Sequence, residues 1–244
     1  MQGTTMNRAK PGKRSAAKTS IRLDTKQQPM QQRAQETFEA ILGVTGRLLG
    51  EVGVERLSTN LICEKAGISP PALYRYFPNK YAILNELGER LMKHQNRAYR
   101  EWLEQEKATP YDGSRDDSIR SLRDMQTAIN AATRRFPGAI WIMRALRAVP
   151  TLRHIRLDSH DDVTETTYQG LRHRYPGADE AALRVAMRLS TEVMYSATEM
   201  AVDNPQIDEN LINTEVAEMV VRYFDKFVEA EEMYKKKPKT GRRR

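Results

Sequence analysis

Apolar residues recur with a helical period from Gln31 onward, and no segment sustains the two-residue alternation typical of a strand. The sequence therefore predicts an all-α fold. Gly53 is the expected C-cap of the first predicted helix. The inward face of this helix is predicted to contain Phe38, Ile41, Leu42, Thr45, Leu48, Leu49 and Val52.

Two short helices are predicted next. Ser58 is the expected N-cap of one, which ends at Gly67, and Ser69 is the expected N-cap of the other, which ends near Phe77. A fourth helix is predicted from about residue 79 to beyond residue 102. Later breaks at TPYDGS, RFPGA, VP, RYPGA and DNPQID bring the expected number of helices to about nine.

The third predicted helix has an unusual outward face. At about 100° per residue, Leu73 and Phe77 face the core and Arg75 is central on the opposite side. Tyr74 and Tyr76 are expected to flank that exposed face. Two short helices joined through a glycine indicate a helix-turn-helix. A helical hairpin with amphipathic tyrosines at its surface is the alternative.

A helix that enters the major groove needs a basic residue and small residues at its centre, and hydroxyls at its edges. Arg75 has the chemistry to pair with a guanine, and Pro71 and Ala72 have the chemistry to contact thymine methyl groups. The two tyrosines and Lys80 are candidates for bonds to the DNA backbone. With Ser69 as cap, Pro70 and Pro71 occupy the first helical turn, where no intrahelical N–H is needed.

The stretch STNLICEKAGISPPALYRYFPNKYAIL, preceded by EVGVERL, resembles the N-terminal domain of TetR-family transcriptional regulators. The resemblance covers roughly residues 31–90. It departs from the family at Pro71-Ala72, where many members have glycine or a hydroxyl residue, and at Cys63, where alanine is usual. It implies DNA contact for Thr59, Asn60, Ser69, Pro70, Pro71, Ala72, Tyr74, Arg75, Tyr76 and Lys80.

The resemblance also implies a function for the whole chain. We expect a sequence-specific transcriptional regulator that binds a partly palindromic operator as a homodimer, most often as a repressor, and is released by a small-molecule effector. The fold it implies is a three-helix DNA-binding domain followed by a larger helical domain for effector binding and dimerisation. The alternative is the same fold acting through a protein partner, without operator or effector.

A wide apolar stripe near the C-terminal end predicts a dimer interface, formed by two helices from each chain. Packing inside one chain is the alternative. The predicted interface residues are Leu183, Met187, Met194, Val216, Met219, Val220, Tyr223, Phe224 and Phe227.

Large, adaptable side chains in the middle helices are candidates for an effector pocket that takes a small apolar or aromatic molecule. Ordinary core packing is the default interpretation for each of them. The candidates are Met125, Ile129, Trp141, Tyr168, Met187 and Met194.

One polar stripe has metal-ligand chemistry. His154, Asp158 and Asp162 are four residues apart, with Asp161 and His160 close by. Arg153 and Arg156 alternate with them, which favours a solvated face, so no metal site is predicted. Cys63 is expected in the core. Neither a phosphate-binding loop nor a catalytic motif is present, so we expect no enzymatic activity and no cofactor besides the effector.

Charge is concentrated at the two ends of the chain. The formal net charge is +8, but residues 1–28 and 233–244 carry more than all of it, the rest of the chain is mildly acidic, and residues 177–232 are strongly acidic. The two ends are predicted to be a disordered basic arm and tail, around a DNA-binding domain at 29–90 and a larger domain at 91–232. No apolar stretch approaches a membrane span or a secretory signal, which predicts a cytoplasmic protein.

Overall fold

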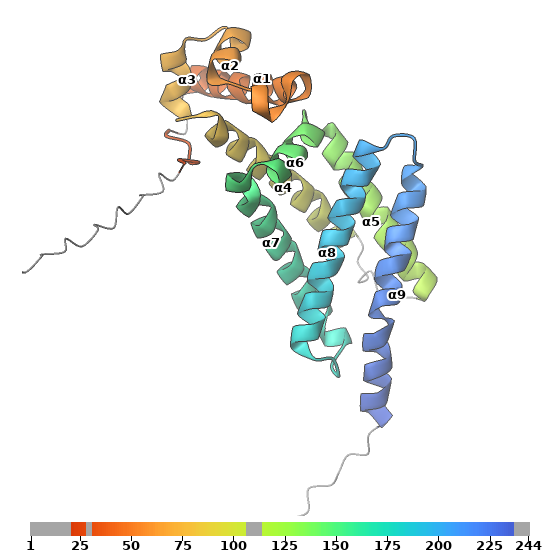
Figure 1. The fold of residues 1–244 in the computed structure, drawn as a ribbon. Coiled ribbons are helices and arrows are strands. Elements are labelled where there is room, and N and C mark those ends of the chain that lie inside the picture. Colours follow the sequence, from red (N-terminus) through yellow and green to blue (C-terminus); the bar gives the residue numbers. More distant parts are fainter. Residues whose placement is uncertain (1–20, 28–30, 106–113, 237–244) are drawn as a thin grey trace, which may run out of the picture.

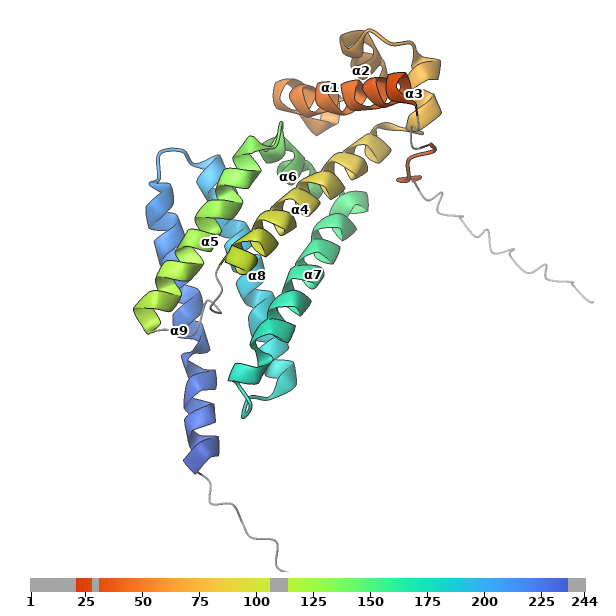
Figure 2. The same ribbon diagram turned by 180° about the vertical axis from the view of Figure 1, so that it is seen from behind.

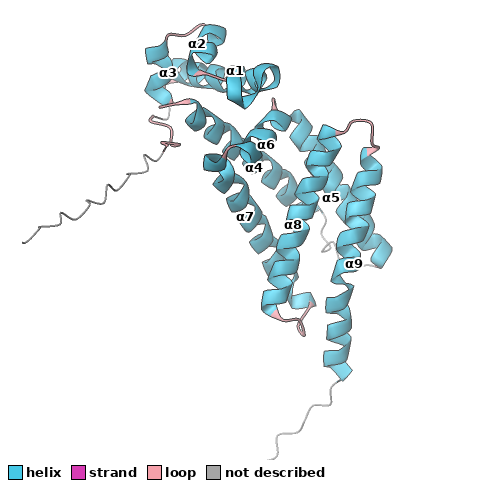
Figure 3. Ribbon diagram, viewed as in Figure 1, coloured by secondary structure: helices cyan, strands magenta, loops and turns pink. Residues whose placement is uncertain are grey.

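The computed structural model describes residues 21–27, 31–105 and 114–236, and within them only helices form the regular structure (Figure 3). This confirms the predicted all-α fold with about nine helices. The α-helices are α1 (Gln32–Arg56), α2 (Thr59–Ala66), α3 (Pro70–Tyr76), α4 (Lys80–Gln105), α5 (Arg115–Arg135), α6 (Ala139–Ala148), α7 (Arg153–Leu171), α8 (Glu180–Asp203) and α9 (Glu209–Lys236). Two short 3-10 turns, η1 (Pro150–Leu152) and η2 (Arg172–Arg174), flank α7.

Helices α1 to α3 form a small unit at one end of the molecule (Figure 1). Leu73 and Phe77 are fully buried, as their predicted angles require, and the Phe77 ring stacks on Phe38 of α1 with centroids 4.8 Å apart. Each such ring removes a large apolar area from water, so these contacts fix a helix of only seven residues. Cys63 also lies in this core, where burial raises the pKa of its thiol.

The turns between these helices follow from the residues at them. Ser58 caps α2 by accepting a hydrogen bond of 3.2 Å from the Leu61 N–H, and Gly67 ends α2 in the left-handed region with φ of 64°. The predicted helix end at Gly53 is only partly right. Its φ of 71° and ψ of 170° break the helical path, yet α1 resumes for one turn and ends at Arg56.

The larger unit contains α4, α5, α7, α8 and α9 around a second core, with α6 packed between the two units (Figures 1 and 2). Helix α4 is continuous across residue 90, so the predicted domain boundary falls inside one helix. Helix α9 likewise continues beyond residue 233, where the tail was predicted to begin.

Close contacts at glycines join the two units. Gly138, in the turn before α6, has φ of 74°, and a methyl group placed on it would lie 2.8 Å from the carbonyl oxygen of Gly46 on α1. One turn further along α1, the Trp141 indole covers Gly50, where an added methyl group would meet its Nε1 at 2.8 Å. These positions admit no side chain without displacing a neighbour.

We expect Gly138→Ala to destabilise the protein by about 1–3 kcal/mol, because the new methyl group adds backbone strain and a clash with the Gly46 backbone. Gly43→Ala is the matched control, since its methyl group would meet only the end of Arg47 at 3.8 Å. That helical substitution should stabilise by roughly 0.5–1 kcal/mol. Urea unfolding midpoints measure both effects, and equal midpoints for Gly138→Ala and the unaltered protein would contradict the packing described here.

Candidate nucleic-acid interface and internal cavity

The outer surface of α3 is exposed over most of its length. Arg75 is central on it, and the Tyr74 side chain is 40% exposed. Ser69, Pro70 and Pro71 are exposed as well, whereas Ala72 is half-buried. A basic group bordered by small residues thus faces solvent on a helix that is anchored from behind.

Thr59 links α2 to this surface. Its hydroxyl lies 2.9 Å from the Tyr74 hydroxyl, so one donates to the other. Asn60, the next residue on α2, is exposed. Polar groups of α2 and α3 are therefore adjacent on one side of the unit.

Ser69 occupies the N-cap position of α3, but its hydroxyl makes no capping hydrogen bond. Pro70 and Pro71 have no N–H to donate, and the first available donor, the Ala72 N–H, donates to the Ser69 carbonyl at 3.0 Å. Ser69 is therefore the N-cap residue, as predicted, but it does not make the side-chain hydrogen bond of a cap. Its side chain lies outside the helical hydrogen-bond pattern, at the exposed start of α3.

Two candidate residues are placed differently from the prediction. Tyr76 is buried, with its ring edge-on to Phe38 at 5.7 Å, so the expectation that it flanks the exposed face is wrong. The Lys80 ammonium donates to the carbonyl oxygens of Val54 and Leu57 at 3.0 and 2.9 Å. It satisfies carbonyls at the end of α1 rather than facing outward for a phosphate.

The segment 21–27, expected to be disordered, lies against α3. The Lys26 N–H donates to the Tyr76 carbonyl at 2.7 Å, and its ammonium donates to the Tyr74 carbonyl at 3.0 Å. Asn79 Nδ2 donates to the Arg22 carbonyl at 2.9 Å. The two bonds from Lys26 occupy carbonyls at the end of α3 that no later helical N–H can reach. The low-complexity composition of this segment gave no indication of the contact.

Residues 1–20 and 28 of the predicted arm lie outside the described residues, as do residues 237–244 of the predicted tail.

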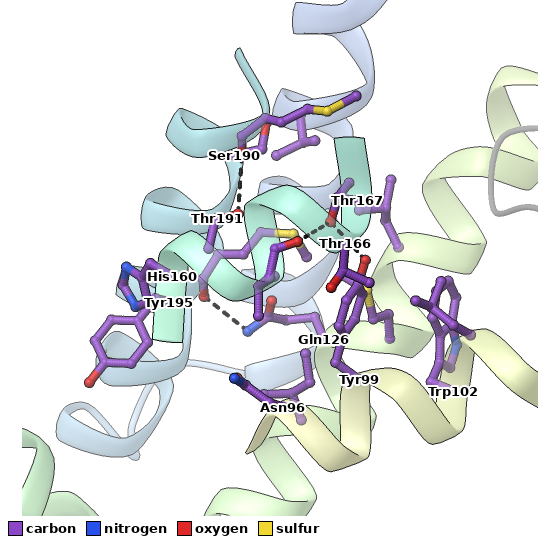
Figure 4. A pocket seen from close by; sticks show the side chains of 18 of the residues that line it. Asn96, Tyr99, Trp102, Gln126, His160, Thr166, Thr167, Ser190, Thr191 and Tyr195 are labelled. Carbon is purple, nitrogen blue, oxygen red and sulfur yellow. Dashed lines mark hydrogen bonds between the residues drawn. The ribbon is translucent and has the colours of Figure 1, made fainter. Parts of the chain in front are cut away.

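Helices α4, α5, α7, α8 and α9 enclose a cavity of about 160 Å³ (Figure 4). Of the six effector-pocket candidates, Met125, Ile129, Met187 and Met194 line it. Trp141 does not, because its indole covers Gly50 at the other unit. Tyr168 does not either, because its ring packs under the Arg184 guanidinium at 3.7 Å.

Most of the cavity surface is apolar, but several lining residues are polar, and helical periodicity did not predict them. Gln126 lies in the middle of the cavity, and His160 and Tyr195 lie together at one end (Figure 4). His160 Nδ1 is 3.0 Å from Glu192 Oε1, at an angle that is not that of a hydrogen bond. Burial lowers the pKa of His160 and outweighs the opposite effect of Glu192. Burial also raises the pKa of Tyr99, another lining residue.

The polar stripe on α7 is engaged by arginines. Asp161 pairs with Arg188, and Asp162 pairs with Arg100. In the described part of the chain no group of His, Cys, Asp and Glu has the arrangement of a metal site. Those residues also contain no helix that is long and apolar enough to cross a membrane.

The predicted dimer interface is largely the core of a single chain. Seven of its nine residues are buried, and only Met219 and Tyr223 are exposed, at 52% and 38%. Most of the apolar stripe is therefore buried within the single chain. Other apolar side chains are exposed on or between α8 and α9: Val185, Leu189, Met200, Ile207, Leu211 and Val228.

Comparison with known proteins agrees with this geometry. The family model described as "Bacterial regulatory proteins, tetR family" matches residues 41–87, which contain the end of α1, α2, α3 and the start of α4. The class C tetracycline repressor protein of Escherichia coli is 41% identical over 54 residues, which are 22% of this chain and 25% of that repressor. The matched stretch is thus about a quarter of the relative's length.

Solved structures share the fold over much more of the chain. A tetR-family transcriptional regulator from Streptomyces coelicolor has a TM-score of 0.57 at 18% identity, over 85% of this chain and 92% of that one. SmeT in a SmeT–triclosan complex has a TM-score of 0.55 at 20% identity, over 78% and 91%. Residues 41–87 thus resemble the helix-turn-helix part of TetR-family transcriptional regulators, and most of the chain shares the fold of such regulators.

Proposed function

We propose that this protein represses transcription by binding a partly palindromic operator as a homodimer, and that a small molecule in the internal cavity releases it. The exposed outer face of α3, with Arg75 at its centre and Leu73 and Phe77 buried behind it, carries the proposal. DNA flanking its own gene is the natural first target for a mobility-shift assay. A protein that binds no duplex at low salt would instead favour action through a protein partner.

Contacts to the operator are assigned by chemistry and exposure. Arg75 pairs with a guanine through its guanidinium, and Pro71 and Ala72 contact thymine methyl groups. Thr59, Asn60, Ser69 and Tyr74 donate to phosphates, and Pro70 shapes the approach of the helix start. Tyr76 and Lys80 have a supporting role, because Tyr76 is buried and Lys80 donates to carbonyls at the end of α1. They position the reading helix and do not contact the operator.

Dimerisation is assigned to the uncovered faces of α8 and α9. Leu189 and Met200 on α8, and Leu211 and Met219 on α9, are each at least 42% exposed in the single chain. If these side chains form one surface, its size would be unusual on a monomer. A twofold axis there would present two copies of α3 to half-sites about 34 Å apart.

Effector release is assigned to the cavity because α4 connects it to the DNA-binding unit. Tyr99 and Gln95, on the second half of α4, line the cavity, and Lys80, at its start, holds the end of α1. A ligand that binds better when α4 is shifted favours a spacing of the two reading helices that no longer fits the operator. SmeT, crystallised with triclosan, is a neighbour of the same fold with a bound small molecule. We propose a cytoplasmic regulator without enzymatic activity.

Arg75→Ala should weaken operator binding by about 1–3 kcal/mol and relax specificity at one base pair, because it removes a bidentate base contact. Fluorescence anisotropy on operators mutated one pair at a time measures this. Arg123→Ala, an arginine of α5 far from α3, is the control and should leave affinity unchanged. A uniform loss across all operator variants would instead make Arg75 a phosphate contact.

Met219→Glu should convert the dimer to a monomer and reduce operator affinity, since each new carboxylate would be buried against the partner. Sedimentation velocity measures the oligomeric state. Lys93→Glu, at an exposed position of α4, places the same charge elsewhere and should leave the dimer intact. An unchanged dimer in Met219→Glu would place the interface on another surface.

Removing residues 1–20, which contain five basic side chains and no acidic one, should flatten the salt dependence of operator binding. Each lost phosphate contact reduces the slope of log K against log salt by about 0.9. The docked segment 21–27 remains, so α3 keeps its partners at Tyr74 and Tyr76. A slope identical to that of the full chain would show that the arm makes no contact with the DNA backbone.

A further inference from the structure

The side-chain amide of Gln126 is oriented by its neighbours in the wall of the cavity. Its nitrogen donates to the Met194 carbonyl at 3.1 Å, to Asn130 Oδ1 at 3.1 Å and to Thr198 Oγ1 at 2.7 Å. A backbone carbonyl only accepts, so the atom facing Met194 must be the nitrogen. The carbonyl oxygen of the amide is thereby turned away from this network.

That oxygen, Oε1 of Gln126, has no hydrogen-bond partner among the described residues, although the residue is only 1% exposed. Buried polar atoms without a partner are rare in native proteins and indicate a missing partner. Gln126 is in direct contact with the cavity, whose volume is about 160 Å³. A donor in the cavity would reach this oxygen after a shift of the Gln126 side chain, and would then be its partner.

Five hydroxyl groups of the lining point to the same class of ligand, although the buried Tyr195 hydroxyl, also in the lining, has no partner among the described residues. Ser190 and Thr191 donate to carbonyls of their own helix at 2.9 and 3.1 Å, and Thr166 and Thr167 do so at 2.8 Å. Because the proton of Thr167 is used in this way, the Tyr99 hydroxyl, 2.8 Å away, donates to it. These five hydroxyls leave oxygen lone pairs, and few protons, for a ligand.

The lining also excludes a charged ligand. Among the described residues that line the cavity, none is Asp, Glu, Lys or Arg. Burial lowers the pKa of His160, the one histidine in the described lining, which favours its neutral form. An ion in this cavity would have no counter-charge in contact with it, and that is costly in an apolar enclosure. Met125, Met187 and Met194 supply an adaptable apolar surface for the rest of the molecule.

We propose that the cavity binds an uncharged, mainly apolar molecule with at least one O–H or N–H group, and that Gln126 Oε1 accepts a hydrogen bond from that group. This inference rests on the proposed function of the cavity as the effector site. The proposal requires a hydrogen-bond donor in the ligand. Apolar packing alone would accept any uncharged molecule of the right size.

The test uses two matched probes on the full chain, 2-naphthol and 2-methoxynaphthalene. The second has a methyl group in place of the hydroxyl proton, so it cannot donate a hydrogen bond. Isothermal titration calorimetry should give at least about tenfold tighter binding of the naphthol, since its ether leaves Gln126 Oε1 without a donor. The anion 2-naphthoate should bind more weakly than the naphthol. Equal affinity for naphthol and ether, or no binding of the naphthol up to its solubility limit, would overturn the proposal.

Gln126→Met keeps the length of the side chain and removes the acceptor, so it should abolish the preference for naphthol while the ether binds as before. Thr198→Val is the matched control, because it disturbs the same network yet leaves Gln126 Oε1 in place, and the preference should persist. A preference that persists in Gln126→Met assigns the acceptor to another residue and contradicts the proposal. If Gln126→Met does not fold, the comparison of probes on the unaltered protein decides.

Operator release is measured separately, by adding each probe to a mobility-shift assay. Naphthol that binds selectively but releases no DNA would contradict the effector role of the cavity and leave its ligand class supported. Probes that bind without preference would overturn the ligand class and leave the repressor function open to other effectors. The two proposals therefore fail in distinguishable ways.

Discussion

The relation between the DNA-binding unit and the rest of the molecule depends on the close approach of α1 to the turn before α6. Gly138 lies so near the Gly46 carbonyl that no side chain fits between them. Trp141 closes the same seam by covering Gly50. Because packed backbones resist gradual deformation, the two units move together or separate at this seam. The orientation of α3 relative to the larger unit follows from that contact.

Helix α4 belongs to both units, which is why no sharp domain boundary exists. Its first residue, Lys80, satisfies carbonyls at the end of α1, and Leu146 and Ile155 pack against Gly88 one-third of the way along. Its second half contributes Tyr99 to the cavity wall. Helix α4 therefore connects the cavity wall to the end of α1 without a break.

Two requirements on the cavity favour different residue types. A helical bundle stays closed by burying apolar residues, yet selective binding needs polar groups with free hydrogen-bonding capacity. Serine and threonine on helices meet both, because they donate to their own backbone and present only oxygen to the interior. Gln126, Asn130 and Thr198 go further and bond to one another across α5 and α8. This network holds one side of the cavity in place.

Local periodicity determined much about this protein, since within one helix the angle per residue is fixed. It identified the helices, the buried anchors Leu73 and Phe77, and the outward position of Arg75. Only the tertiary structure decided what depends on a second element. Phe38 on α1 buries Tyr76, and the end of α1 turns Lys80 inward. The apolar stripe on α8 and α9 was visible in the sequence. Which of its residues are buried inside a single chain depends on how α5 and α7 pack against these helices. The free acceptor of Gln126 likewise depends on α5 meeting α8, and no spacing along a single helix encodes it.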